Sequence, residues 1–355
     1  MPQRLRMDVL IPTHNRAASL ERCVRSLIDA DPSPYLDVRI VVICNGCRDG
    51  SEQIVRGLQA DVPGRVALIV ERRQGKSKAL NAGIAASTAD LVGMVDDDEA
   101  VDPRWFVVAG EAFQDPALEV IGGPYLPVWA APPPDWVPRE YLAALGVVDN
   151  GPVARPFDRD FPGQLMGGNA IVRRTTLDAV GPFAEHLGPG SHGRLFSCED
   201  EDLYLRLLER GARGEYLPAL VIYHYIPESR LSRDYFRRWC FWRGVSLGLM
   251  DRRHPLPVAY FAGLPRFLWG RAARAALRLL AGSGADLSAE RLQDELRIWD
   301  AAGYFYGRQI YPLARFSPVK SRRKTNGRAP EAAASPAAVG LLSESIHERH
   351  GHPAG

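Results

Sequence analysis

Short apolar runs alternate with amphipathic segments along the first 125 residues of the chain. The runs are rich in Val, Ile and Leu, as strands buried on both faces of a sheet are. The segments between them space their apolar residues three or four positions apart, as helices covering a sheet do. We expect strands at 8–12, 38–44, 66–70, 89–95 and 118–121, with helices at 17–30, 49–59, 77–86 and 103–113. This alternation predicts an α/β fold with a mostly parallel, Rossmann-like sheet flanked by helices.

The pattern changes after residue 125. Eight prolines between 125 and 165 indicate an irregular excursion over the sheet. Order returns at 165–174, and Leu203 and Leu207 then lie on one face of an expected helix. The remaining expected elements are a strand at 217–223 and a C-terminal helical extension at 234–250, 258–280 and 289–304. The Ala/Pro/Ser/Gly-rich tail at 317–355 has too little apolar sequence to fold, so we expect it to be disordered.

Four consecutive acids, Asp96 to Glu99, follow the expected strand at 89–95 directly. Like charges this close raise one another's pKa unless a cation neutralises them. A hard divalent metal would do so, because it prefers carboxylate oxygen and leaves positions open for phosphate. The acids could instead form a solvated turn, since acidic residues are favoured before a helix. We favour the metal interpretation, because a helix start does not explain an uninterrupted run at a strand end.

Three further polar loops follow the first three expected strands, at 12–16, 44–51 and 72–83. Ligands of parallel sheets bind at the carboxyl ends of the strands, so these loops are candidate nucleotide contacts. In the third loop Gly75 and Lys76 open a helix and offer backbone N–H groups and a charge to an anion. The glycine patterns of P-loops and of dinucleotide-binding turns are absent from the sequence. The loops at 12–16 and 44–51 could also be ordinary helix caps and turns.

Bulk composition is that of a soluble globular protein. The chain has 355 residues, 46% of them apolar and 24% charged, with a net charge of +2. We see no secretory signal and no run of about 18 apolar residues that would span a bilayer. Five scattered cysteines fit reduced thiols in the cytoplasm better than disulfides. We therefore expect a cytoplasmic protein and no nucleic-acid partner.

Seven segments appear in an order that resembles the family 2 glycosyltransferases. They are VLIPTHNR, ICNGCRDGS, QGKSKALNAG, VDDDEAVDPRWF, MGGNAIVRR, CEDEDLYLRLLERG and YLPALVIYHY. The resemblance covers about 8–250, and its second half is most similar to bacterial members that act on cell-surface or secreted polysaccharides. It implies a GT-A fold, a nucleotide-diphosphate sugar as donor, Mn²⁺ or Mg²⁺ as cofactor, and inversion at the transferred carbon.

The resemblance also implies roles for individual residues. Asp98 is the expected metal ligand, Asp96 lies toward the ribose, and His224 completes the metal shell, although a histidine at a strand end can also be structural. Asp97 is expected to lie beside the nucleotide as a neighbour of these acids. Asn45 is expected to approach the base. The other expected contacts to the nucleotide and its diphosphate are Pro12, Thr13, Asn15, Arg16, Arg73, Lys76 and Asn81.

Inversion needs one carboxylate to take the proton of the attacking hydroxyl. The family's Glu-Asp element falls on Glu199 and Asp200, and we expect Asp200 to be the base with Glu199 beside it. Asp202 is expected to hold the helix start or to pair with an Arg. Acids at a helix start are also favoured by the helix dipole, which is the structural alternative. Gly168 and Asn169 are expected to form a tight turn beside the donor sugar.

Cys44 departs from the family pattern, which often has an acid before the Asn of this loop. A thiol offers no charged acceptor to a base, so uracil, guanine and thymine stay open. We expect a nucleotide-sugar-binding half at 1–125 and an acceptor and catalytic half of the same GT-A domain at 126–230. C-terminal helices are expected at 231–316, and the tail follows. Selectivity for donor and acceptor is expected to lie in the loops at 125–165 and 188–196.

The segment 256–280 mixes aromatic and aliphatic residues with four arginines. Such a basic amphipathic helix can lie at the inner surface of a membrane, where acceptors would be lipid-linked sugars. It can equally pack on a core with its Arg face in water. Glycans and small molecules are the other acceptor classes that we consider.

Two other functions are compatible with a nucleotide-binding α/β fold. A sugar-phosphate nucleotidyltransferase would also use metal, but it normally has a Gly-rich N-terminal phosphate loop, which 12–15 lacks. A non-catalytic nucleotide-sugar-binding module would not need the acids at 199–200. Metal-dependent glycosyl transfer is therefore the leading prediction.

Overall fold

The computed structural model describes residues 4–190, 197–252, 255–281 and 288–311. It divides into two compact units, Met1–Ser232 and Arg233–Gly355. The predicted tail at 317–355 lies outside the described residues, as does 191–196 of the predicted selectivity loop.

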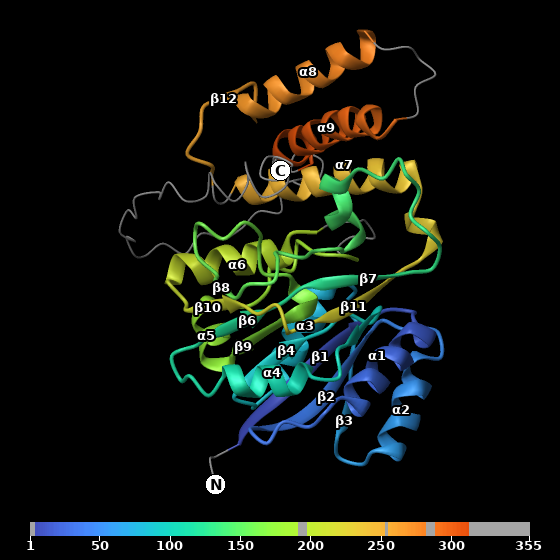
Figure 1. The fold of residues 1–355 in the computed structure, drawn as a ribbon, viewed down its shortest axis with the longest axis vertical. Helices are drawn as coiled ribbons and strands as arrows, with labels where there is room; N and C mark the ends of the chain where they lie inside the picture. The colour runs from blue at the N-terminus through green and yellow to red at the C-terminus, as the bar shows by residue number, and fades with distance from the viewer. Residues whose placement is uncertain (1–3, 191–196, 253–254, 282–287, 312–355) are drawn as a thin grey trace, which may run out of the picture. The chain divides into compact units, whose positions relative to one another are not determined.

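The first unit is built on an eight-stranded sheet, with strand order β3-β2-β1-β4-β9-β6-β10-β8 (Figure 1). Its strands are β1 Leu5–Thr13, β2 Leu36–Asn45, β3 Val66–Glu71, β4 Leu91–Met94, β6 Val120–Gly122, β8 Arg155–Pro156, β9 Ala170–Arg173 and β10 Gly214–Tyr216. Strands β3, β2, β1 and β4 are parallel to their neighbours. β9 runs antiparallel to both β4 and β6, so the predicted mostly parallel sheet is confirmed with one reversed strand inside it.

Helices cover both faces of this sheet, as the apolar pattern predicted. The unit contains α1 Ala17–Asp29, α2 Ser51–Asp61, α3 Lys76–Ala86, α4 Trp105–Ala112, α5 Arg174–Val180 and α6 Glu199–Arg210. Val9 and Ile11 of β1 point into a core shared with α1, α2 and α4. Leu10 points to the opposite face, where it lies against Gly83 of α3. This alternation explains why β1 is apolar at almost every position.

A second sheet of three strands adjoins the acidic loop. It has the order β5-β11-β7, from Glu99–Val101, Ile222–Ile226 and Tyr125–Trp129. Its register pairs His224 with Glu99, and the backbone N–H of Tyr225 donates to the carbonyl of Asp98 at 3.0 Å. The expected strand at 217–223 is therefore wrong in its bounds, because residues 217–221 form the turn that separates β10 from β11. The apolar pattern of the sequence does not show that the chain leaves the first sheet after β10 and enters the second sheet at β11.

The Pro-rich excursion contains short helical turns at η1 Arg139–Leu145 and η2 Gly167–Asn169, and a further turn follows β11 at η4 Glu228–Arg230. The second unit contains α7 Arg233–Asp251, β12 Tyr260–Phe261, β13 Leu264–Pro265, α8 Arg266–Ala281, α9 Ala289–Phe305 and a terminal helical turn at Tyr306–Ile310. The helix expected at 258–280 begins only at Arg266, because the preceding residues form a β12–β13 hairpin with its turn at Ala262 and Gly263. No helix within the described ranges combines the length and hydropathy needed to cross a bilayer.

Candidate active site

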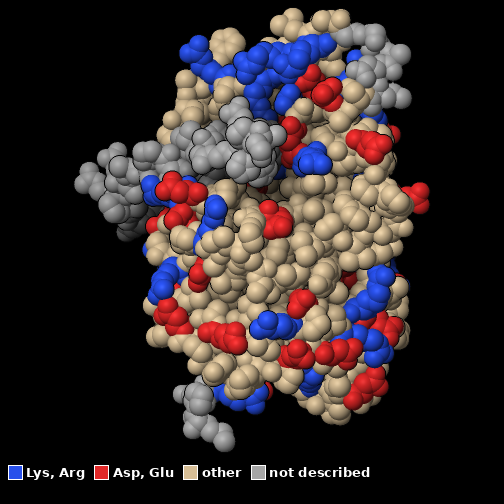
Figure 2. Space-filling model, in the orientation of Figure 1, with Lys and Arg blue, Asp and Glu red and all other residues tan. Residues whose placement is uncertain are grey.

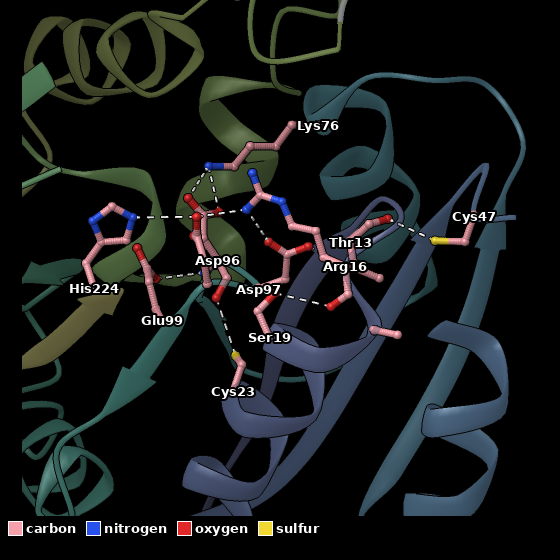
Figure 3. Close-up of polar contacts among 12 residues, drawn as sticks. Thr13, Arg16, Ser19, Cys23, Cys47, Lys76, Asp96, Asp97, Glu99 and His224 are labelled. Atoms are coloured by element: carbon pink, nitrogen blue, oxygen red, sulfur yellow. Dashed lines mark hydrogen bonds and ion pairs between the residues drawn. The ribbon is translucent and has the colours of Figure 1, made fainter. Parts of the chain in front are cut away.

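The carboxyl ends of β1, β2, β3 and β4 bring the predicted polar loops to one edge of the sheet. Parallel pairing sets Thr13 beside Cys44, while Met94 of β4 pairs with Leu10. The acidic residues that follow Met94 therefore emerge beside the loop that follows Thr13. Figure 3 shows the side chains that meet there.

The acidic loop is fixed from both of its ends. The carboxylate of Glu99, which is 3% exposed, accepts the backbone N–H of Asp96 at 2.7 Å. The hydroxyl of Thr13 donates to Asp97 at 2.7 Å. Arg16, from the start of α1, donates to Asp97 at 2.9 Å and to Asp98 at 2.8 Å (Figure 3). Asp97 and Glu99 therefore shape the loop, which leaves Asp96 and Asp98 to face the open side.

Asp98 lies at the meeting point of three nitrogen-bearing side chains. Its Oδ2 accepts from Arg16 and, at 2.9 Å, from Arg230. The same oxygen is 3.6 Å from Nε2 of His224, which is buried on β11. The sequence therefore predicted correctly that Asp98 and His224 would lie close together. Their role as metal ligands stays a prediction.

Burial and neighbouring charges act on the acidic loop in opposite senses. Burial raises the pKa of Asp97 to about 6, and the charge of Arg16 only partly offsets it. Burial would also raise the pKa of Asp98, but the positive charges of Arg16 and Arg230 beside it lower the pKa below its ordinary value. Asp98 therefore keeps its negative charge, which a cation ligand requires.

Lys76 links this loop to the second acidic segment. Gly75 precedes it with φ of +133°, a conformation that needs glycine, and α3 begins immediately afterwards. The ammonium group of Lys76 is 2.7 Å from Asp96 and 3.5 Å from Glu199. Burial would lower the pKa of Lys76, but the surrounding carboxylates raise it, so it stays charged. It places a fixed positive charge between the two acidic segments.

The helix α6 begins at Glu199, as the sequence predicted. Glu199 is 5% exposed, and burial, helped by the charge of Asp200, raises its pKa to about 7 despite Lys76. Asp200 is half-buried, and its two oxygens accept the backbone N–H groups of Gly167 at 3.2 Å and Glu201 at 3.0 Å. Asp202 is confirmed as a partner of an arginine, since Arg206 donates to it at 3.0 Å.

Three predicted asparagines have their amides bonded inside the fold. Asn45 donates to the carbonyls of Glu71 and Arg73 and accepts the N–H of Gly75. Asn81 exchanges two hydrogen bonds with the backbone of Phe183. Asn169, which is fully buried, accepts from the indole of Trp105 and donates to the carbonyls of Pro124 and Leu220. These contacts support the loops of the site, and contact between the asparagines and a ligand stays a prediction.

The remaining predicted residues border the site at varying depth. Pro12 is buried within β1, and Asn15, at φ of +54°, accepts the backbone N–H of Arg48 at 2.7 Å. Arg73 is exposed and pairs with Glu71 at 2.7 Å. Gly168 lies so close to Glu99 that a Cβ atom would come within 2.6 Å of its carboxylate. Because Gly168 has no side chain, Glu99 has room to accept the backbone N–H of Asp96.

The donor set fits a divalent cation that also binds a diphosphate. A buried carboxylate and a buried imidazole face the same point, and oxygen and imidazole together suit Mn²⁺. Within the described ranges, no group of three or more His, Cys, Asp or Glu side chains could hold a metal ion. A metal bound at Asp98 and His224 would therefore need further ligands from phosphate oxygens and water, and the role of these two residues as ligands stays a prediction.

Sequence reasoning missed two residues of this centre. Arg230 contacts both Asp98 and His224, at 2.9 and 3.2 Å, although it is distant from Asp98 in sequence. Gly146 ends η1 with φ of +69°, and a Cβ there would come within 2.6 Å of the His224 ring. Nothing in the local sequence singles out either residue. Gly146 comes close to His224 because β11 folds against the Pro-rich excursion, whereas Arg230 lies in the turn that directly follows β11.

Comparisons with known proteins agree with this geometry. The family model for glycosyl transferase family 2 matches residues 8–157. The glucosyl-dolichyl phosphate glucuronosyltransferase of Haloferax volcanii is 24% identical over 257 residues, covering 71% of this chain and 79% of that protein. The pre-mycofactocin glycosyltransferase of Mycobacterium tuberculosis is 27% identical over 350 residues, covering 91% of this chain and 68% of that protein.

A solved structure supports the fold. The mannosyltransferase from Pyrobaculum calidifontis, in complex with GDP-Man and Mn²⁺, aligns with a TM-score of 0.59 at 19% identity and covers 87% of this chain and 89% of that chain. At this identity the likeness shows the fold alone, which is the predicted GT-A fold. The chain therefore belongs to glycosyltransferase family 2 and is a glycosyltransferase.

Proposed function

We propose that this enzyme transfers a sugar from a nucleotide-diphosphate sugar to a hydroxyl acceptor, with inversion and with Mn²⁺ or Mg²⁺ bound at Asp98 and His224. The observation that carries the proposal is the proximity of Asp98 to His224, 3.6 Å apart, at the sheet edge. Arg16 and Lys76 also point to this edge (Figure 3). A diphosphate bound at this edge would contact the cationic side chains directly, and a metal ion held by Asp98 and His224 would also bind it.

The metal would offset the charge that develops on the departing nucleoside diphosphate. Lys76 would also stabilise the departing diphosphate, because its ammonium group, 2.7 Å from Asp96, brings a positive charge to the site. The structurally similar mannosyltransferase, crystallised with GDP-Man and Mn²⁺, supports a nucleotide sugar and a metal as ligands of this fold. The base stays open, since Cys44 is buried and carries no charge to read it.

Asp200 is the proposed general base. Its carboxylate is half-buried and held in place by the N–H groups of Gly167 and Glu201, so an acceptor hydroxyl can reach it. Glu199 is less suited to this role, because its side chain is almost fully buried and already faces the ammonium group of Lys76. Glu199 instead contacts Lys76 and tunes the charge around the diphosphate. The two acids at the start of α6 therefore have different proposed roles, because Glu199 is buried and Asp200 is only half-buried.

The Asp200→Asn variant tests the assignment. It should lower the transfer rate by roughly 10²- to 10⁴-fold, because a general base contributes about that much. Nucleotide affinity, measured by calorimetry, should stay within about twofold of wild type, since the hydrogen bonds of Asp200 run to the backbone N–H groups of Gly167 and Glu201. Asp202→Asn is the matched control, because it removes an acid of the same helix turn that pairs with Arg206. Equal losses of transfer and of nucleotide binding would assign Asp200 to folding instead.

A panel of nucleotide sugars with Mn²⁺ separates the proposed reaction from its alternatives. Slow release of nucleoside diphosphate supports glycosyl transfer. Pyrophosphate formation from a nucleoside triphosphate and a sugar phosphate would indicate a nucleotidyltransferase, and tight binding without turnover a non-catalytic module. The active donor in the panel also identifies the base.

The acceptor is proposed to be a glycan or a lipid-linked sugar reached at the inner membrane surface. The Haloferax volcanii relative carries a lipid, glucosyl-dolichyl phosphate, in its name. In this chain α8 exposes an apolar stripe flanked by Arg266 and Arg274, and Figure 2 shows the basic side chains gathered along α8. The stripe consists of Trp269, Leu277 and Leu280 of α8, together with Phe261 of β12 beside Trp269; these four are 41, 66, 83 and 67% exposed. A tryptophan, aliphatic residues and flanking arginines suit an anionic lipid surface.

A further inference from the structure

Arg230 contacts the two atoms that a metal ion would use. One guanidinium nitrogen donates to Oδ2 of Asp98 at 2.9 Å, and the other lies 3.2 Å from Nε2 of His224. A guanidinium group has donors and no lone pair, so Nε2 of His224 is the acceptor in the second contact. Arg230 therefore hydrogen-bonds to a lone pair of Asp98 and to a lone pair of His224, the two residues proposed as metal ligands. A divalent cation at this position would have to displace it.

The surroundings hold Arg230 in this position. The arginine lies in η4, the turn that follows β11, and its side chain is 21% exposed. Asp98 and His224 are 13 and 7% exposed, so the contacts form where solvent screening is weak. Arg16 adds a second guanidinium to the same Asp98 oxygen, and it is 44% exposed. The negative charge of Asp98 is thus neutralised by the protein itself, with the more buried of the two arginines bridging to His224.

We propose that Arg230 is an internal cation that occupies the metal position in the donor-free protein and moves to the diphosphate when donor and metal bind. This inference rests on the proposed function, since it needs the metal at Asp98 and His224. A guanidinium group released from a carboxylate requires another anion, and a diphosphate oxygen supplies one with matching geometry. Metal alone would have to break the Arg230 contacts without that compensation. Donor and metal therefore bind cooperatively.

The variant Arg230→Gln should change two affinities in opposite directions. Mn²⁺ alone, followed by the electron paramagnetic resonance signal of the free ion, should bind roughly tenfold tighter, because a charge-assisted competitor has been removed. Inorganic pyrophosphate, measured by calorimetry in EDTA, should bind roughly tenfold weaker, because an anion contact has been lost. A residue that only supports the fold would weaken both affinities. That outcome, or an unchanged Mn²⁺ affinity, overturns the proposal.

Two further variants complete the test. Arg230→Lys keeps the charge but cannot bridge Asp98 and His224 as a fork does, so Mn²⁺ alone should again bind tighter than to wild type. A wild-type Mn²⁺ affinity in Arg230→Lys would mean that the charge acts at a distance, and it overturns the proposal. Arg25→Gln is the charge-matched control, since Arg25 lies exposed on α1 and pairs with Glu21. It should leave both affinities unchanged.

Asp98→Asn distinguishes a failure of this inference from a failure of the proposed metal site. If Asp98→Asn abolishes Mn²⁺ binding and Arg230→Gln leaves it unchanged, the metal site stands and the role of Arg230 is wrong. If Mn²⁺ binds equally well to wild type and Asp98→Asn, the metal site itself is wrong, and the inference falls with it. Thermal unfolding of each variant verifies that the fold is intact.

Discussion

Asp97 and Asp98 are adjacent in sequence, yet their pKa values shift in opposite directions. Asp97 lies in the interior with Thr13 and Arg16, and burial raises its pKa to about 6. Asp98 is also buried, but the positive charges of Arg16 and Arg230 lower its pKa. The sequence indicated a cation at this run of acids, and at the level of single residues it favoured Asp98. It could not indicate that two arginines would supply that charge, because Arg230 is 132 residues from Asp98 in the sequence and reaches it only through the pairing of β11 with β5.

Glu199 gives a prediction for pH dependence in the metal-free protein. Its pKa in the folded protein is about 7, above the ordinary 4.5, so the folded state binds the proton more tightly. The free energy of unfolding should therefore fall as pH rises from about 5 to about 7.5, by about 1–3 kcal/mol from this group. Glu199→Gln should remove that part of the dependence. Urea unfolding at both pH values measures it, and parallel pH profiles of the two proteins would contradict the prediction.

At the scale of elements, buried polar side chains join segments that the sequence pattern treats separately. Asn169 ends η2, just before β9, and connects α4 with the backbone before β7 and before β11. The sequence predicted a tight turn here, and η2 is such a turn, but it gave no sign of these partners. The apolar pattern also placed the strand at 217–223 incorrectly, because it cannot show where the chain passes from one sheet to another. Element identity follows local pattern, whereas the partners of an element depend on the fold.

Asn169→Ala should destabilise the protein by about 2–4 kcal/mol. The change removes the partner of the indole N–H of Trp105 and of the buried carbonyl of Leu220, while the carbonyl of Pro124 keeps only the N–H of Ile222, and each unpaired group is costly. Asn81→Ala is the matched comparison, because Asn81 is only half-buried and bonds to one residue, Phe183. Its loss should be smaller, about 1–2 kcal/mol. Urea unfolding of both variants checks the order, and an equal or inverted order would contradict it.

At the scale of the whole molecule, a catalytic unit and a helical unit with a different surface share one chain. The first unit gathers its charges at the carboxyl edge of the sheet, as open α/β sheets do with their ligands. The second unit exposes an apolar stripe on α8 between arginines, which catalysis in the first unit does not require. The sequence suggested both a membrane surface and a packed core for this segment. Trp269 and Leu277 are exposed, and contact with a membrane stays a prediction.

The full chain should float with vesicles of anionic phospholipid and stay unbound with neutral vesicles. Leu277→Glu should weaken binding by roughly tenfold, because it removes an exposed aliphatic side chain that would contact the lipid and adds a repelling charge. Trp299→Ala is the control, since Trp299 is a similarly exposed tryptophan that lies on α9 beside Phe241. Flotation that is equal with both lipids, or unaffected by Leu277→Glu, would exclude the proposed surface.

The sequence by itself determined the alternation of strands and helices, the loops that carry polar residues, and the position of the acids after β4 and at the start of α6. These features follow from local periodicity and from the direction of parallel strands, which fixes where loops emerge. Only the tertiary structure decided which charges meet. Arg230 reaches Asp98, Gly146 leaves room for the ring of His224, and Lys76 lies between Asp96 and Glu199. Such contacts join residues far apart in the chain, and the state of each carboxyl group depends on its burial and neighbours, which sequence order does not specify.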